Sequence, residues 1–95
     1  GGGLSGPAIH PVAVRAVHDV HAALPDLPIV GVGGVADAEG AVELLLAGAR
    51  AVQVGTATFA DPRTVLRVLE GLETWCDRHR VRAVEELTGA LAPDA

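Results

Sequence analysis

The stretch Pro28-Ile-Val-Gly-Val-Gly-Gly-Val35 decides the fold, because a short apolar run there breaks into glycines and leads at once to Asp37. An apolar run that is bounded by glycine is typical of a buried strand, and an aspartate just before a helical pattern often begins a helix. We therefore predict a strand over Ile29 to Val32, a tight loop at Gly33-Gly34 and a helix that begins near Asp37 and ends at Gly48.

A second unit of the same kind follows in Ala51-Val-Gln-Val-Gly-Thr-Ala57. It predicts a strand over Ala51 to Val54. Asp61 then predicts the cap of another helix, with Pro62 in its first position and an end near His79. Two strands joined by a helix form a right-handed parallel crossover unit, so the two strands should lie side by side.

Amphipathic helices flank this unit. The spacing of the apolar residues predicts a helix over Pro11 to Leu24, with an apolar face made of Val12, Val14, Val17, Val20 and Leu24. The last long helix has a predicted apolar face of Val65, Leu69, Leu72 and Cys76. A short helical pattern over Val84 to Leu87 and a loose tail over residues 90–95 complete the chain.

The predicted sheet is too small to stand alone. Two parallel strands cannot cover both of their faces, because parallel sheets are buried on both sides and need several neighbours. The chain also has no methionine and begins with three glycines. We expect an α/β architecture that is incomplete as given and forms the last part of a larger barrel or doubly wound sheet.

Composition narrows the function classes. The net charge is −5, and the basic residues are seven scattered arginines, which argues against a nucleic-acid surface. The single cysteine, Cys76, excludes an internal disulfide and a cysteine metal cluster, and its register with the apolar face predicts a buried structural thiol. His18 and His21 have no third ligand, so a solvated helix face is favoured over a metal site. No apolar run approaches the length of a membrane span, and we expect a cytoplasmic protein.

Glycines after both predicted strands indicate a binding site for an anion. Gly33-Gly34 lies between a strand and a helix N-terminus, where unpaired backbone N–H groups suit a phosphate. Gly55-Thr56 adds further N–H groups and a hydroxyl one strand away. A tight turn without a ligand is the plainer interpretation of either motif alone. The glycine-rich residues 1–6 are either a third part of this site or a flexible end, and His10 beside them is the histidine of most interest.

The stretch from Gly31 to Ala36 also fits the dinucleotide fingerprint G-x-G-x-x-A directly after a strand. That fingerprint expects an acidic residue about 20 positions later, at the end of the next strand, to bind a ribose. The next strand ends in Val54-Gly55-Thr56 instead, which argues against a dinucleotide.

Three stretches together resemble a known family. In order, they are Gly2-Gly-Leu-Ser-Gly-Pro-Ala-Ile9, Pro28-Ile-Val-Gly-Val-Gly-Gly-Val35 and Leu46-Ala-Gly-Ala-Arg-Ala-Val-Gln-Val-Gly-Thr-Ala57. They resemble the C-terminal part of class 1 dihydroorotate dehydrogenase, a flavin-containing (β/α)8 TIM barrel of pyrimidine biosynthesis. The resemblance implies that residues 1–95 are the C-terminal segment of such a barrel and include its last two strands.

The resemblance also implies a cofactor site for flavin mononucleotide (FMN). Its residues would be Gly6 in the first loop, Gly33 and Gly34 after the seventh strand, and Gly55 and Thr56 after the eighth. The family commonly carries lysine where this chain has His10. The family's catalytic cysteine on a mid-barrel loop has no counterpart here, so no catalytic residue and no metal site is expected in this chain.

In the parent reaction a base removes the C5 proton of dihydroorotate while hydride passes from C6 to the flavin. The subtype most resembled works with a separate iron–sulfur/FAD subunit and NAD, and a homodimer is expected. We do not expect activity from these residues alone. The alternatives are a dihydropyrimidine dehydrogenase-like flavin barrel, a non-redox phosphate-binding barrel, and an independent half-barrel interaction module without flavin.

Overall fold

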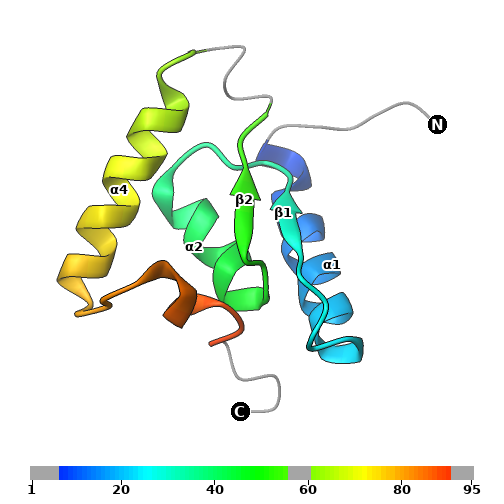
Figure 1. The fold of residues 1–95 in the computed structure, drawn as a ribbon. Helices are drawn as coiled ribbons and strands as arrows, with labels where there is room; N and C mark the ends of the chain where they lie inside the picture. Colours follow the sequence, from blue (N-terminus) through cyan, green and yellow to red (C-terminus); the bar gives the residue numbers. More distant parts are fainter. Residues whose placement is uncertain (1–6, 56–60, 91–95) are drawn as a thin grey trace.

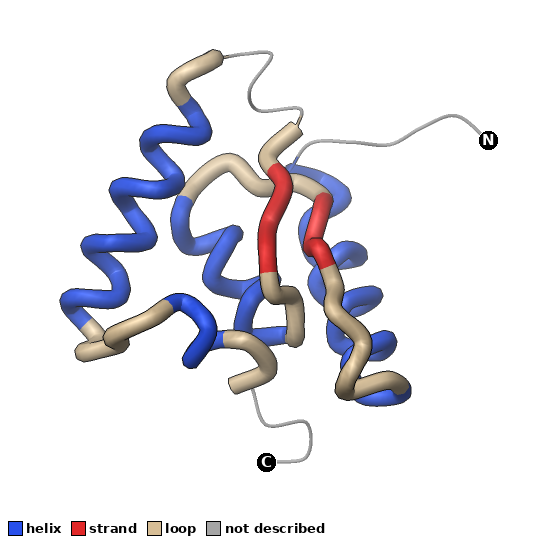
Figure 2. The backbone as a smooth tube through the Cα atoms, viewed as in Figure 1, coloured by secondary structure: helices blue, strands red, loops and turns tan. Residues whose placement is uncertain are grey.

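The computed structural model describes residues 7–55 and 61–90 of the 95-residue chain (Figure 1). Helices and strands alternate along it, and Figure 2 separates the two classes by colour. In chain order the elements are η1 (Pro7–Ile9), α1 (His10–Ala23), β1 (Val30–Val32), α2 (Ala38–Ala47), β2 (Ala51–Gln53), α4 (Thr64–Arg78) and η2 (Val84–Leu87).

The two strands form a parallel pair, as the sequence predicts. Val30 lies opposite Ala51, and Val32 lies opposite Gln53. The helices lie on one side of this pair, with α2 between α1 and α4 (Figure 1). No described element covers the other face, and Val30 and Val32 on it are 61% and 51% exposed. The small parallel α/β layer is therefore confirmed.

The core lies between the sheet and α2. Leu44 and Leu45 of α2 are fully buried, and the backbone of β1 approaches them closely at Gly31. A Cβ at Gly31 would lie 3.1 Å from Ala49 Cβ and 3.2 Å from Leu44 Cβ. Because these contacts are tighter than ordinary van der Waals distances, β1 can pack this deeply only without a side chain at position 31.

Helix α2 begins and ends as predicted. The Asp37 carboxylate is the N-cap and accepts a hydrogen bond from the Gly40 N–H at 2.8 Å. This arrangement satisfies one of the four N–H groups that a helix leaves free at its start. Gly48 ends the helix with φ of +139°, a conformation that favours glycine.

The predicted start of α4 is wrong. Asp61 does not cap the helix, which begins three residues later at Thr64 with Arg63 at the N-cap. The cause is a tight turn, in which both the N–H and the hydroxyl of Thr64 bond to the Asp61 carbonyl. The Asp61 carboxylate accepts from the Arg63 N–H instead of a helical N–H.

The predicted apolar faces of α1 and α4 are also wrong in part. In α4 the buried residues are Thr64, Val68 and Cys76, whereas Val65 and Leu69 are 50% and 52% exposed. In α1 only Val17 is buried, and its neighbours Val12, Val20 and Leu24 are exposed. Apolar residues on these helices extend around more than one face, so the spacing alone does not identify the side that packs.

The prediction for the cysteine is confirmed, whereas the prediction for His21 is wrong. Cys76 is buried and free, as predicted. The solvated face predicted for His21 is wrong, because its ring packs against two glycines: a Cβ on Gly48 would lie 2.5 Å from the ring and one on Gly89 2.6 Å from Nε2. The small residues leave room for an imidazole between the end of α2 and the C-terminal segment.

Candidate functional site

The loops that follow β1 and β2 meet at one edge of the sheet, where α1 begins (Figure 1). The parallel register places Val32 and Gln53, the last strand residues, opposite each other. The backbone therefore leaves both strands at the same level, with Gly33-Gly34 on one side and Gly55 on the other. This confirms that the two strand ends adjoin.

The loop after β1 has a backbone that favours glycine at two successive positions. Gly33 has φ of +134° and Gly34 has φ of +68°. A Cβ at Gly33 would also lie 2.7 Å from the Cβ of Ala13 in α1. Conformation and close packing thus both explain the glycine at position 33, and they hold the loop against α1.

The N–H groups of this loop are available to a ligand. The Gly34 N–H has no hydrogen-bond partner among residues 7–55 and 61–90. Asp37 already occupies part of the N-terminus of α2 by capping Gly40. An anion at this edge would therefore meet loop N–H groups in front of the helix, while the helix dipole still favours a negative charge there.

Gly55, after β2, is exposed. Among the described residues, no heavy atom outside its chain neighbours lies within 4 Å of the position that a Cβ on Gly55 would take. Gly55 therefore borders space that the described residues leave open, whereas Gly33 is packed against α1. Gly6 and Thr56, the other predicted cofactor residues, lie outside the described residues.

His10 contacts the glycine loop directly. Its Nδ1 lies 2.8 Å from the Gly33 carbonyl oxygen, and its Nε2 lies 3.5 Å from the Glu43 carboxylate on α2. The side chain is only 13% exposed. Sequence reasoning marked this histidine by its position beside the first glycines, but only the fold reveals its partner 23 residues away.

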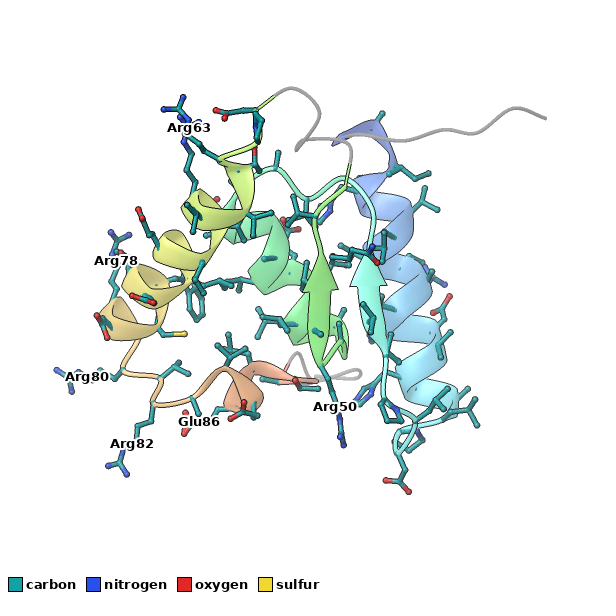
Figure 3. All side chains as sticks on the ribbon, turned by 45° about the horizontal axis from the view of Figure 1, so that its top comes forward. Arg50, Arg63, Arg78, Arg80, Arg82 and Glu86 are labelled. Atoms are coloured by element: carbon teal, nitrogen blue, oxygen red, sulfur yellow. The ribbon has the colours of Figure 1, made fainter. Side chains whose placement is uncertain are left out.

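The arginines in the first turns of α4 are paired with one carboxylate. Arg63, at the start of α4, and Arg67 both contact the Asp61 carboxylate, at 3.3 and 2.8 Å. These hydrogen bonds and charges lower the pKa of Asp61, with the Arg63 N–H as the largest cause. Figure 3 shows Arg50 toward the opposite end of the molecule from Arg63.

Two further site classes find no support in the described part of the chain. No group of three His, Cys, Asp or Glu side chains could hold a metal ion there. None of its helices combines the length and apolar character that crossing a membrane requires. The backbone N–H groups at the strand ends have the chemistry that an anion requires.

A family model, similar relatives and solved structures all point to one family. A family model described as dihydroorotate dehydrogenase matches residues 1–75. Two similar relatives are described as catalytic subunits of dihydroorotate dehydrogenase B (NAD(+)). The one from Parabacteroides distasonis is 49% identical over 95% of this chain, and the one from Methanothermobacter thermautotrophicus is 53% identical over 98%. A relative from Solibacter usitatus, described as a putative dihydroorotate dehydrogenase A (fumarate), is 50% identical over 95% of the chain.

The fold has solved counterparts as well. A ligand-free crystal structure of the dihydroorotate dehydrogenase from Eimeria tenella superposes with a TM-score of 0.91 at 26% identity. It covers 97% of this chain, which in turn covers 26% of that structure. The chain likewise spans 29% and 30% of the length of the Parabacteroides and Methanothermobacter relatives.

Proposed function

This chain belongs to the dihydroorotate dehydrogenase family, and from that premise we propose that residues 1–95 are the C-terminal segment of a class 1 enzyme that oxidises dihydroorotate to orotate in pyrimidine biosynthesis. The chain covers 29% and 30% of the length of the Parabacteroides and Methanothermobacter relatives, which supports its being a segment of a longer enzyme. The segment contributes β1 and β2 as the last two strands of a (β/α)8 barrel.

The bare sheet face supports the barrel. In a closed barrel, alternate strand residues point inward and the others point to the helices outside. Gly31 of β1 faces the helices and is buried, whereas Val30 and Val32 point to the bare side and are exposed. Further strands would cover these two valines and form hydrogen bonds along the free edges of the pair.

The site at the strand ends fits the phosphate of FMN. The observation that carries the proposal lies at one edge of a parallel pair: no described residue accepts the Gly34 N–H, and the described residues leave open space at Gly55. Phosphate sites of (β/α)8 barrels are often built from the loops after the seventh and eighth strands. Gly6 and Thr56 complete the proposed set with Gly33, Gly34 and Gly55.

The residues of this chain suit it to hold the cofactor and not to carry out the reaction. Hydride acceptance is flavin chemistry, and the protein contributes binding, orientation and electrostatics. The glycine loops hold the phosphate end and fix the ring system relative to the substrate. The groups that remove the substrate proton lie in the rest of the barrel, so the 95 residues alone should be inactive.

The partners follow from the relatives. Two of them are described as catalytic subunits of an NAD(+)-linked enzyme, a wording that implies another subunit. We assign this protein to the same subtype: a cytoplasmic homodimer with an iron–sulfur/FAD electron-transfer subunit. The Solibacter relative, with its fumarate description, is about as similar, so the electron acceptor is the part of the proposal that most needs a direct test.

The test uses the whole protein that carries this chain. We expect it to be yellow as purified, to release FMN on denaturation, and to be bleached by dihydroorotate under anaerobic conditions. Addition of NAD or fumarate to the bleached enzyme, with and without the electron-transfer subunit, then identifies the acceptor by the return of colour.

Two controls separate the rival functions. Bleaching by dihydrouracil and not by dihydroorotate would indicate a dihydropyrimidine dehydrogenase-like enzyme. A colourless protein that binds inorganic phosphate but no flavin would indicate a non-redox barrel. Either result would overturn the proposed function.

A further inference from the structure

We propose that His10 is a positioning residue of the flavin phosphate site, which fixes the orientation of the peptide between Gly33 and Gly34. This inference rests on the proposed function, because it concerns the same site. It adds a side chain from α1 to a site whose other described members, Gly33, Gly34 and Gly55, offer backbone groups alone.

The contacts of His10 place its ring between three elements. His10 is the first residue of α1. Its Nδ1 lies 2.8 Å from the Gly33 carbonyl oxygen, and its Nε2 lies 3.5 Å from the Glu43 carboxylate on α2. It also packs on Gly40, where a Cβ would lie 3.4 Å from His10 Cε1. The ring is therefore held on both sides and is little exposed.

The hydrogen bond defines which ring nitrogen carries a proton. A carbonyl oxygen only accepts, so the short contact requires a proton on Nδ1. Nε2 is left facing Glu43 at a distance longer than a good hydrogen bond, and it has no other partner among the described residues. The bond to Gly33 is thus the strong polar contact of this side chain.

Peptide geometry transmits this contact to the ligand edge. The Gly33 carbonyl and the Gly34 N–H belong to one planar trans peptide, so they point in opposite directions. When His10 holds the carbonyl toward α1, the Gly34 N–H is directed away from it, into the space where no described residue accepts it. Two glycines in succession would otherwise let this peptide rotate freely.

The sequence neighbours of His10 explain how it reaches the loop. Pro11 stands in the first turn of α1, where its fixed backbone angle favours a helix start. Ala13, one turn further, packs against the loop at the position where Gly33 lacks a side chain. The start of α1 therefore lies directly on the glycine loop.

The experiment compares two ligands, FMN and riboflavin, on the reconstituted whole protein. Riboflavin has the same ring system and lacks the phosphate. Its affinity therefore measures flavin binding without the contacts to the phosphate. For His10→Phe, which keeps a ring and removes the donor, we expect FMN binding about tenfold weaker, the scale of one hydrogen bond, with riboflavin binding unchanged. For His10→Asn, whose amide can still donate to the carbonyl, we expect FMN binding within about threefold of wild type.

His18→Ala is the matched control, since His18 lies on the same helix and makes no hydrogen bond to a described residue. It should bind both ligands as wild type does. Unchanged FMN binding in His10→Phe, or an equal loss for both ligands, would overturn the proposal. If wild-type protein itself binds riboflavin as tightly as FMN, the phosphate site fails, which is a failure of the proposed function and not of His10 alone.

A measurement on the unsubstituted protein covers the case in which the Phe variant does not fold. An NMR experiment that detects coupling across hydrogen bonds should connect His10 Nδ1 to the Gly33 carbonyl carbon. Absence of that coupling in the FMN-bound protein, where the Nδ1 proton is otherwise visible, would count against the proposal.

Discussion

At the scale of single residues, both the packing of α1 and the shape of the candidate site depend on the absence of a Cβ at Gly33. We expect Gly33→Ala to destabilise the protein by about 2–5 kcal/mol, because its φ of +134° strains any other residue and the new Cβ would lie 2.7 Å from Ala13 Cβ. Urea unfolding of the whole protein, followed by circular dichroism, measures this loss. FMN binding should weaken as well.

Gly55→Ala is the control for Gly33→Ala. The φ of Gly55 lies outside the left-handed region, and the described residues leave room for a Cβ there, so the substitution should change the free energy of unfolding by about 1 kcal/mol or less. If Gly33→Ala is equally harmless, the described conformation of the loop is wrong.

Asp61 gives stability a dependence on acid pH. Its pKa is lowered in the folded protein, chiefly by the Arg63 N–H and further by the arginine side chains. A carboxyl whose folded pKa is below its unfolded value of about 3.9 stabilises the protein above that pH, and the contribution is lost as the pH falls through the folded pKa.

We therefore expect Asp61→Asn to melt at a lower temperature than wild type at neutral pH, with the difference shrinking below about pH 4. Thermal melts from pH 3 to pH 7 measure this. Glu43→Gln is a useful comparison, because Glu43 is 57% exposed and its contact with His10 is long. A gap between wild type and Asp61→Asn that stays constant down to pH 3 would contradict the assigned role.

At the scale of elements, α2 and α4 pack through two small residues. A Cβ on Gly71 of α4 would lie 2.5 Å from Ala38 Cβ at the start of α2, where carbon atoms normally keep about 3.5–4.0 Å. Gly71→Ala gains about 1 kcal/mol of helix propensity but forces two helices apart, at about 1–3 kcal/mol. We expect a net loss of stability.

Adding Ala38→Gly should restore the lost stability, because it removes the atom that clashes. A double-mutant cycle on unfolding free energies should therefore show a favourable coupling of about 1–3 kcal/mol between these sites. Additive effects would mean that α4 does not approach α2 this closely.

Local signals predicted the elements well where one residue determined the backbone. Gly33-Gly34, Asp37 and Gly48 each have a backbone or capping role that few other residue types fill, and the loop and helix ends fall where they indicate. Prediction failed where one side chain has several possible partners nearby. The Asp61 side chain is taken by Arg63 and Arg67, and no local rule distinguishes that pairing from a helix cap.

The sequence predicted one part of the candidate site and not the other. Adjacent glycine loops could be predicted, because parallel strands bring their carboxyl ends to one edge. The contact of His10 could not, since it joins residues 23 positions apart and depends on how α1 lies against β1. The family resemblance gave no hint of it either, as that family commonly carries lysine at this position.

At the scale of the whole molecule, exposed apolar residues of α4, Val65 and Leu69, form a surface that the proposed barrel would cover. Val54, Val65 and Leu69 line an open groove of about 190 Å³ between the free edge of β2 and α4. Exposed apolar surface of this kind usually marks an interface. We expect the remainder of the protein to cover this groove.

Leu69→Lys and Leu66→Lys test this expectation as a matched pair. The two leucines are similarly exposed on α4, at 52% and 60%, but only Leu69 lines the groove. In the whole protein, Leu69→Lys should lose about 2–4 kcal/mol, because a charge would replace a leucine that the further strands of the proposed barrel would bury. Leu66→Lys should change stability by less than about 1 kcal/mol. Urea unfolding measures both, and equal tolerance of the two lysines would mean that the groove stays open and that the barrel does not close there.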